Sequence, residues 1–350
     1  MKVLVTGHRG YIGSVLVPLF QAAGHEVRGL DSDLFARSTY GPASALPTVD
    51  EVRRDIRDVT IDDVRGVDAV VHLAGMANDP MGDLVPEVTM AVNHEATVRL
   101  AGLAKEAGIE RFVFSSSCSV YGAATEEWVT ETSRPNPVTP YGQSKLDAEH
   151  DLIALADDRF TPVFMRSATA YGFSPRIRFD LVINNLAAYA FTKGAVFIKS
   201  DGMPWRPVVH IEDIARAMLA AVEAPRDVVH GEAFNVGQTT ENYRIHELAS
   251  IVERTVPDSK VEYAPGNNPD KRTYRVDCTK IARTLHGFKP QWTAERGAQE
   301  LYRHYKAIGL TESEFEGPRY QRLAHLKGLI ASGDVDEAFR WQTAPEAATA

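Results

Sequence analysis

The fold of this chain is set by the stretch Val3-Leu-Val-Thr-Gly7-His-Arg-Gly10-Tyr-Ile-Gly13. It begins as an apolar strand and continues into glycines at the start of a helical pattern. The first glycine permits a tight turn, the second lets the backbone approach a pyrophosphate, and the third allows close packing of helix on strand. The helix start also offers free N–H groups and the positive end of a dipole. A purely structural turn is the alternative, but the strand before and the helix after favour a dinucleotide site. Its expected contacts are Gly7, Arg9, Gly10, Tyr11, Ile12 and Gly13.

Strands and helices alternate through the first half of the chain. Strands are expected at 3–6, 26–30, 69–73, 111–115 and 161–166, and helices at 11–23, 86–107 and 142–156. The strands are nearly continuous apolar runs, as expected where both faces of a sheet are covered. The pattern predicts an α/β fold with a Rossmann-type doubly wound parallel sheet.

The second half is less regular and predicts a smaller mixed α/β lobe. We expect residues 1–170 to form the dinucleotide-binding domain with the catalytic residues, and 171–308 to form the substrate lobe, with chain exchange between the two. Residues 309–350 are expected to form a polar helical appendage and a flexible tail.

Composition excludes several classes of function. The chain has 350 residues, 44% of them hydrophobic, and a net charge of −9 without blocks of like charge. We therefore expect neither nucleic acid nor a membrane as a partner. The first residues lack the features of a cleavable signal, and Cys118 and Cys278 do not make a disulfide framework, so we expect a cytoplasmic protein. No CxxC or HExxH motif is present, and no metal site is expected.

Asp31 ends the second predicted strand. A carboxylate there accepts hydrogen bonds from the adenosine ribose hydroxyls and repels a 2′-phosphate, which favours NAD over NADP. The alternative is a solvated loop residue, and Arg9 or Arg28 would soften the preference. Asp55 and Ile56 follow a third short strand and are expected near the adenine.

Tyr141 and Lys145 are four residues apart and share one face of a predicted helix. A nearby ammonium and a positively charged nicotinamide would favour the phenolate of Tyr141, which then takes a proton from a substrate hydroxyl. The hydroxyl of Ser117 would hold the substrate oxygen or shuttle the proton. An isolated Tyr-x-x-x-Lys is usually a solvated helix face, but here it follows a strand that ends in serines.

These motifs, in this order, resemble the extended short-chain dehydrogenase/reductases, and within them the nucleotide-sugar epimerases and dehydratases of the UDP-galactose 4-epimerase kind. The residues that carry the resemblance are Gly7–Gly13, Asp31, Asp55-Ile56, His72–Gly75, Asn93, Ser115–Gly122 and Tyr141–Lys145. The resemblance implies that Ser117, Tyr141 and Lys145 are catalytic. It further implies that Leu73, Ala74, Gly75, Asn93 and Ser115 contact the cofactor.

The second lobe adds matches for a nucleotide-sugar diphosphate. Asn185 lies in a segment similar to one that contacts this group in the family, and Arg206 opens an Arg-x-x-x-His-x-x-Asp segment whose arginine reaches it. A guanidinium binds phosphate bidentately, although without the family context Arg206 is equally a surface ion pair. The arginine expected near residue 267 is missing, and Arg272 or Arg275 would substitute. His210 is interpreted as structural.

Departures from the family pattern reduce the number of family reactions that this chain is expected to catalyse. The dehydratases carry Asp-Glu after the catalytic hydroxyl, where this chain has Cys118 and Ser119. Ala77 replaces an epimerase lysine, and Arg176 and Arg178 add unusual positive charge, so the sugar pocket should differ from that of UDP-galactose 4-epimerase.

The resulting hypothesis is an NAD-dependent nucleotide-sugar epimerase acting at C4. The alternatives are an NAD(P)H-dependent keto-sugar 4-reductase, less favoured a 4,6-dehydratase, and a non-catalytic NAD-binding protein. Family members commonly dimerise through two long helices, here 87–107 and 142–157, so a homodimer is expected.

Overall fold

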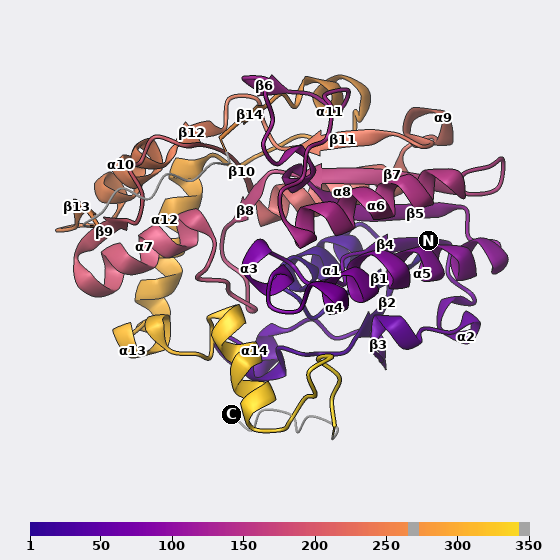
Figure 1. The fold of residues 1–350 in the computed structure, drawn as a ribbon, viewed down its shortest axis with the longest axis horizontal. Helices are drawn as coiled ribbons and strands as arrows, with labels where there is room; N and C mark the ends of the chain where they lie inside the picture. The colour runs from indigo at the N-terminus through magenta and orange to yellow at the C-terminus, as the bar shows by residue number, and fades with distance from the viewer. Residues whose placement is uncertain (265–272, 343–350) are drawn as a thin grey trace.

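The computed structural model describes residues 1–264 and 273–342, and in this part of the chain the central sheet has seven strands, all parallel (Figure 1). Their order is β11-β7-β5-β4-β1-β2-β3. The order reverses between β1 and β4, where the carboxyl ends of a doubly wound sheet open a ligand crevice. The predicted Rossmann-type fold is confirmed. The strands are β1 (Lys2–Thr6), β2 (Glu26–Asp31), β3 (Asp50–Arg53), β4 (Ala69–His72), β5 (Arg111–Ser117), β7 (Thr161–Ser167) and β11 (Ala233–Val236).

Helices cover both faces of this sheet because its strands are apolar on both sides. Val3 and Val5 of β1 face one core cluster, and Leu4 between them faces another. On the first side lie α1 (Gly13–Ala22) and α8 (Ile211–Glu223), and on the second α5 (Ala96–Glu106) and α6 (Pro140–Ala154). Shorter helical segments are α2 (Ile61–Val64), α3 (Asp79–Gly82), α9 (Arg226–Val229), α11 (Thr279–Thr284), η1 (Ala36–Ser38), η2 (Ala43–Ala45), η3 (Ile56–Asp58) and η5 (Cys118–Tyr121).

The helix predicted over 86–107 is interrupted. It consists of α4 (Pro86–Met90), the π-helical segment η4 (Ala91–Glu95) and α5. The wider turn carries Asn93, whose Oδ1 accepts a hydrogen bond from the Met76 amide at 2.7 Å. A π-helical segment often marks a functional position, which the apolar periodicity did not reveal.

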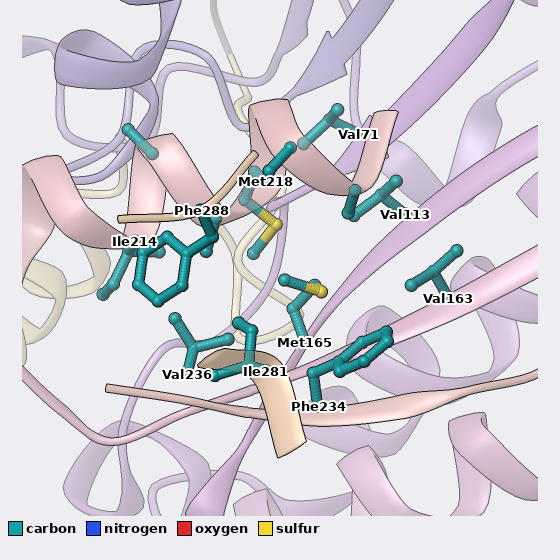
Figure 2. Close-up of a cluster of buried hydrophobic side chains, with 14 of the residues drawn as sticks. Val71, Val113, Val163, Met165, Ile214, Met218, Phe234, Val236, Ile281 and Phe288 are labelled. Carbon is teal, nitrogen blue, oxygen red and sulfur yellow. The ribbon is translucent and has the colours of Figure 1, made fainter. Parts of the chain in front are cut away.

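The core on the α8 side joins residues from distant parts of the chain (Figure 2). Strand residues Val71, Val113 and Met165 point toward Ile214 and Met218 of α8. Strand β11 completes the sheet edge beside β7, so the second half of the chain contributes to the first domain.

The second lobe contains a three-stranded sheet, a strand pair and three helices that pack around one apolar cluster, and a further strand pair that packs against the first-domain core. Its helices are α7 (Val182–Lys193), α10 (Ile245–Thr255) and α12 (Ala294–Ile308). Its strands are β8 (Thr169–Tyr171), β10 (Trp205–His210) and β12 (Asn242–Arg244), the pair β9 (Ala195–Ile198) with β13 (Lys260–Tyr263), and the pair β6 (Trp128–Val129) with β14 (Arg275–Val276).

The segment after α12 folds back on the first domain. It contains α13 (Glu312–Glu316), which contacts α7, and α14 (Arg322–Ala331), which is drawn in yellow beside the indigo segment that follows β2 in Figure 1. Leu326 and Phe339 form a small apolar cluster with Met76 and Met81. Residues of this segment therefore contribute to a buried apolar cluster. No helix within residues 1–264 and 273–342 has the length and apolarity needed to span a bilayer.

Candidate active site

A cavity of about 940 Å³ lies at the carboxyl ends of β1, β2, β4 and β5 and extends toward the second lobe. Most of the predicted site residues line it, although they come from segments far apart in sequence. They are Gly7, Arg9, Gly10, Tyr11, Ile12, Gly13, Asp31, Asp55, Ile56, Leu73, Ala74, Gly75, Ser115, Ser117, Tyr141, Lys145, Asn185 and Arg206.

The glycine turn leaves no room for side chains. Gly7 has a φ of +73°, and a Cβ there would lie 2.7 Å from the Ala74 nitrogen. A Cβ on Gly13 would lie 2.6 Å from the His8 Cα. Helix α1 begins without a side-chain cap at Ile12, so its first N–H groups suit a diphosphate.

Asp31, the predicted ribose contact, ends β2 and lines the cavity. Its two carboxylate oxygens accept hydrogen bonds from the backbone amides of Arg9 at 2.9 Å and Asp33 at 2.8 Å. These bonds orient the carboxylate at the cavity wall and leave it lone pairs for two hydroxyl groups. Burial raises the pKa of Asp31, and the two amide bonds act against that effect.

The neighbouring charged residues are already paired. Arg9 binds both carboxylate oxygens of Glu51, at 2.7 and 2.8 Å, and Arg28 donates to Asp50 at 3.1 Å. Burial alone would raise the pKa of Asp55, but hydrogen bonds from Arg57 hold it below its ordinary value. Arg9 and Arg28 are therefore engaged with carboxylates, which leaves them less suited to a 2′-phosphate.

Tyr141 lies in the first turn of α6, where Pro140 and the Thr139 side-chain cap fix the helix start. The Thr139 hydroxyl accepts a hydrogen bond from the Gly142 amide at 3.1 Å. Burial raises the pKa of Tyr141, and a hydrogen bond with Ser117 acts against it. Ser117 Oγ is itself oriented by the Ser119 amide, 3.1 Å away. The phenol and the serine hydroxyl are thus brought together from α6 and the end of β5.

Lys145 lies behind the phenol rather than against it. Its Nζ donates to the Ser115 carbonyl at 2.8 Å and is 6.0 Å from the centre of the Tyr141 ring. Burial lowers the pKa of Lys145 to about 8, and Glu149 acts against this. The sequence predicted that this ammonium favours the phenolate, but among the protein's own groups burial dominates and raises the pKa of Tyr141.

Asn93 lies behind the cavity wall and not in its lining. It is fully buried, its Nδ2 donates to the Met76 carbonyl at 3.0 Å and to Ser144 Oγ at 3.1 Å, and its Oδ1 contacts the Met76 amide. Asn93 thereby connects the loop after β4 to α6.

In the second lobe, Asn185 and Arg206 reach the cavity from α7 and β10. Arg275 is not in the cavity lining; it pairs with Glu127 and stacks on Trp128 and Trp205. Arg272 falls outside the described residues. His210 is buried, lies 2.8 Å from Glu300 and stacks on the Trp292 ring, in line with a structural role.

Several cavity residues were missed as site residues by the sequence interpretation. Arg178 is paired with Asp180 at 2.6 Å, and its charge acts against the rise that burial causes in the pKa of Tyr141. Gln321, Arg322 and Phe339 enter from the appendage. The positive charge of Arg178 was visible in the sequence, but no local signal placed the appendage at the cavity.

Comparison with known proteins identifies the family. Residues 3–237 match the model of the NAD dependent epimerase/dehydratase family. The chain belongs to this family. The resemblance seen in the sequence is confirmed, and the chain is an enzyme with NAD as its cofactor. The glycine turn, the uncapped start of α1 and the oriented Asp31 carboxylate fit that dinucleotide.

Members with different reactions are similar to this chain. A UDP-glucose 4-epimerase of Bacillus subtilis (strain 168) is 28% identical over 334 residues, 86% of this chain and 94% of the relative. A UDP-glucuronic acid decarboxylase of Arabidopsis thaliana, number 4, is 27% identical over 316 residues, 87% of this chain and 69% of the relative. The structure of UDP-glucuronic acid 4-epimerase from Bacillus cereus with UDP-glucuronic acid and NAD is 26% identical, with a TM-score of 0.74 over 88% of this chain and all of the other.

Proposed function

We propose that the protein is an NAD-dependent nucleotide-sugar epimerase that inverts C4 through a transient keto sugar. The observation that carries the proposal is one cavity shared by three groups of residues. The NAD-binding turn lies at one end, Asn185 and Arg206 lie on the second lobe, and Ser117 and Tyr141 line the same space.

The protein's part in the reaction is to bind the sugar and to move one proton. Arg206 is suited to the substrate diphosphate, because a guanidinium matches the phosphate oxygens. Tyr141 takes the proton of the C4 hydroxyl, and Ser117, hydrogen-bonded to it, positions the sugar oxygen. NAD held by the glycine turn and Asp31 would supply the hydride acceptor and donor for inversion at C4. Tyr141 then gives its proton back to the C4 oxygen.

The residues beside Ser117 do not favour elimination of water. Burial raises the pKa of the Cys118 thiol well above its ordinary value, and its Sγ lies 3.2 Å from the Arg166 carbonyl. Ser119 is hydrogen-bonded to Ser117 at 3.1 Å. Neither side chain is an acid–base group at neutral pH, which supports epimerisation over 4,6-dehydration.

The test is a panel of nucleotide sugars incubated with the NAD-loaded enzyme and followed by NMR and mass spectrometry. We expect conversion of a gluco- to a galacto-configured sugar without a change in mass. UDP-glucuronic acid belongs in the panel because a relative that decarboxylates it is similar to this chain, and loss of 44 mass units would contradict simple epimerisation. Stoichiometric consumption of NADH with a keto-sugar substrate would assign a reductase instead.

We further expect the enzyme to work in the cytoplasm as a homodimer. Cys118 and Cys278 are both buried free thiols, which suits a reducing compartment. The outer face of α6 carries Ile153 at 43% exposure, an apolar residue available to a partner copy.

A further inference from the structure

Arg322, the first residue of α14, brings a buried cation into the cavity from the appendage. Its side chain lines the cavity although the residue is only 4% exposed. The guanidinium lies over the Phe35 ring, 4.0 Å from its centre. Because Phe35 follows Asp31 closely in the loop after β2, the appendage reaches the end of the cavity that binds the dinucleotide.

The charge of Arg322 has no carboxylate partner within the described residues. Its neighbours Arg176 and Arg178 are paired with Asp33 at 2.9 Å and with Asp180 at 2.6 Å. Arg322 instead donates from Nη2 to the Arg176 carbonyl at 3.0 Å, and its buried Nη1 has no hydrogen-bond partner in residues 1–264 and 273–342. Burial lowers the pKa of Arg322 to about 9, and the charge of Arg178 adds to this, while the more distant carboxylates of Asp180 and Asp31 act against it. A buried unpaired guanidinium is costly, so an anion in the cavity would satisfy it.

The surroundings of Arg322 place that anion on the cofactor rather than on the sugar nucleotide. The loop that supplies the Arg176 carbonyl also carries Ser174, whose Oγ lies 2.9 Å from Ser14 Oγ at the start of α1. The start of α1 is the phosphate-binding turn. The expected substrate contacts Asn185 and Arg206 come instead from α7 and β10.

We propose that Arg322 donates hydrogen bonds to the pyrophosphate of NAD, and that residues 309–342 are a cofactor-binding element. The element is anchored around the adenosine end: Trp341 Nε1 donates to the Ser32 carbonyl at 2.9 Å, and Arg37 pairs with Asp334 at 2.6 Å. The Bacillus cereus 4-epimerase is matched along its whole length by 88% of this chain, so about an eighth of this chain is additional, roughly the length of residues 309–350. The proposal requires that the protein binds NAD, and it is independent of which sugar reacts.

The test is calorimetric titration of NAD+ into apoprotein, with wild type, Arg322→Met, Arg322→Lys and Lys327→Ala compared. We expect Arg322→Met to weaken NAD+ binding by roughly 10- to 100-fold, because a charged hydrogen-bond donor to phosphate is lost. The NAD+ affinity of Arg322→Lys should lie between those of the wild type and Arg322→Met, because lysine keeps the charge without the planar guanidinium. Lys327→Ala removes an exposed cation from the same helix and should leave NAD+ binding unchanged.

Thermal unfolding separates this role from a structural one. Without NAD+, Arg322→Met should unfold at the wild-type temperature or above it, because an unpaired buried charge is removed. Addition of NAD+ should raise the unfolding temperature of Arg322→Met by less than it raises that of the wild type. Unchanged NAD+ affinity in Arg322→Met overturns the proposal, and so does weaker binding of UDP-glucose to the NAD-saturated variant with normal NAD+ affinity. Failure of the epimerase assay would leave these binding results standing.

Discussion

At the scale of single residues, burial decides how the active-site groups ionise. Tyr141 and Lys145 are one helical turn apart, yet the surrounding protein raises the pKa of the phenol and lowers that of the ammonium to about 8. Both shifts disfavour the charged forms, which is the effect of a low dielectric. A positively charged nicotinamide next to the phenol would act in the opposite direction on Tyr141.

Replacement of Tyr141 by Phe tests whether the protein is an enzyme of the proposed kind. We expect the rate of C4 inversion to fall about 1,000-fold, because the proton acceptor is removed while the ring remains. The dissociation constant of NAD+ should change less than threefold. Turnover within tenfold of the wild type would contradict the assigned role and favour the non-catalytic alternative.

His72 makes the stability of the folded protein depend on pH, and this dependence can be measured. It is fully buried between the hydroxyls of Thr6 and Thr97, at 2.6 and 2.7 Å, and burial lowers its pKa to about 3. The unfolded chain binds a proton near pH 6.5 while the folded protein does not, so stability falls as the pH drops through this window.

The corresponding variant is His72→Asn, which keeps a neutral polar group. From pH 7 to pH 5, the wild type should lose about 2 kcal/mol more of its unfolding free energy than the variant, by urea titration. Equal losses in the two proteins would mean that His72 is protonated in the folded state.

At the scale of elements, a buried ion pair joins β7 to α6, the helix that carries Tyr141 and Lys145. Arg166 and Glu149 are 7% and 5% exposed and bind at 2.6 Å, and Ser116 Oγ donates to the same carboxylate at 2.5 Å. Burial lowers the pKa of Lys145, and Glu149, one helical turn away on α6, acts against this lowering. The contact therefore fixes α6 on the sheet and acts on the charge of Lys145.

Removing one partner of the Arg166–Glu149 pair should lower the unfolding free energy far more than removing the charges of both. We expect Arg166→Met to lower the unfolding free energy by about 3–5 kcal/mol, because Glu149 is left buried and unpaired. The double variant with Glu149→Gln should recover most of this loss. Arg65→Met breaks an exposed pair with Asp62 and is the control, with an expected change below about 1 kcal/mol. If Arg166→Met and Arg65→Met lowered the unfolding free energy by similar amounts, the argument would be contradicted.

At the scale of the whole molecule, the cavity forms only where three parts of the chain meet. The first domain supplies the glycine turn, Ser117 and Tyr141, the second lobe supplies Asn185 and Arg206, and the appendage supplies Arg322 and Phe339. Strand β11, from the second half of the chain, is part of the central sheet. Because β11 belongs to the same sheet as the strands of the first half, the packing of that core also fixes how the two halves of the chain are positioned.

The expected homodimer belongs to this scale as well. If α5 and α6 form the interface, Ile153→Glu should shift the protein from dimer to monomer in light scattering after size exclusion. Ile308→Glu, at an apolar residue of similar exposure on α12, should leave the dimer intact. A wild-type monomer at micromolar concentration would contradict the expectation.

Local sequence patterns were sufficient to predict most of the helices and strands and the chemical type of each expected site residue. The glycine spacing at Gly7–Gly13, the position of Asp31 after a strand and the Tyr141–Lys145 pair each depend on neighbours within one or two turns, so they are visible in the chain itself. Long-range packing was needed for everything that depends on which surfaces meet. It interrupted the helix at Asn93, kept Arg275 away from the cavity and raised the pKa of Tyr141 by burial. It also carried Arg322 to the cofactor end of the cavity, because the apolar side chains that hold the appendage find their partners almost 250 residues earlier in the chain.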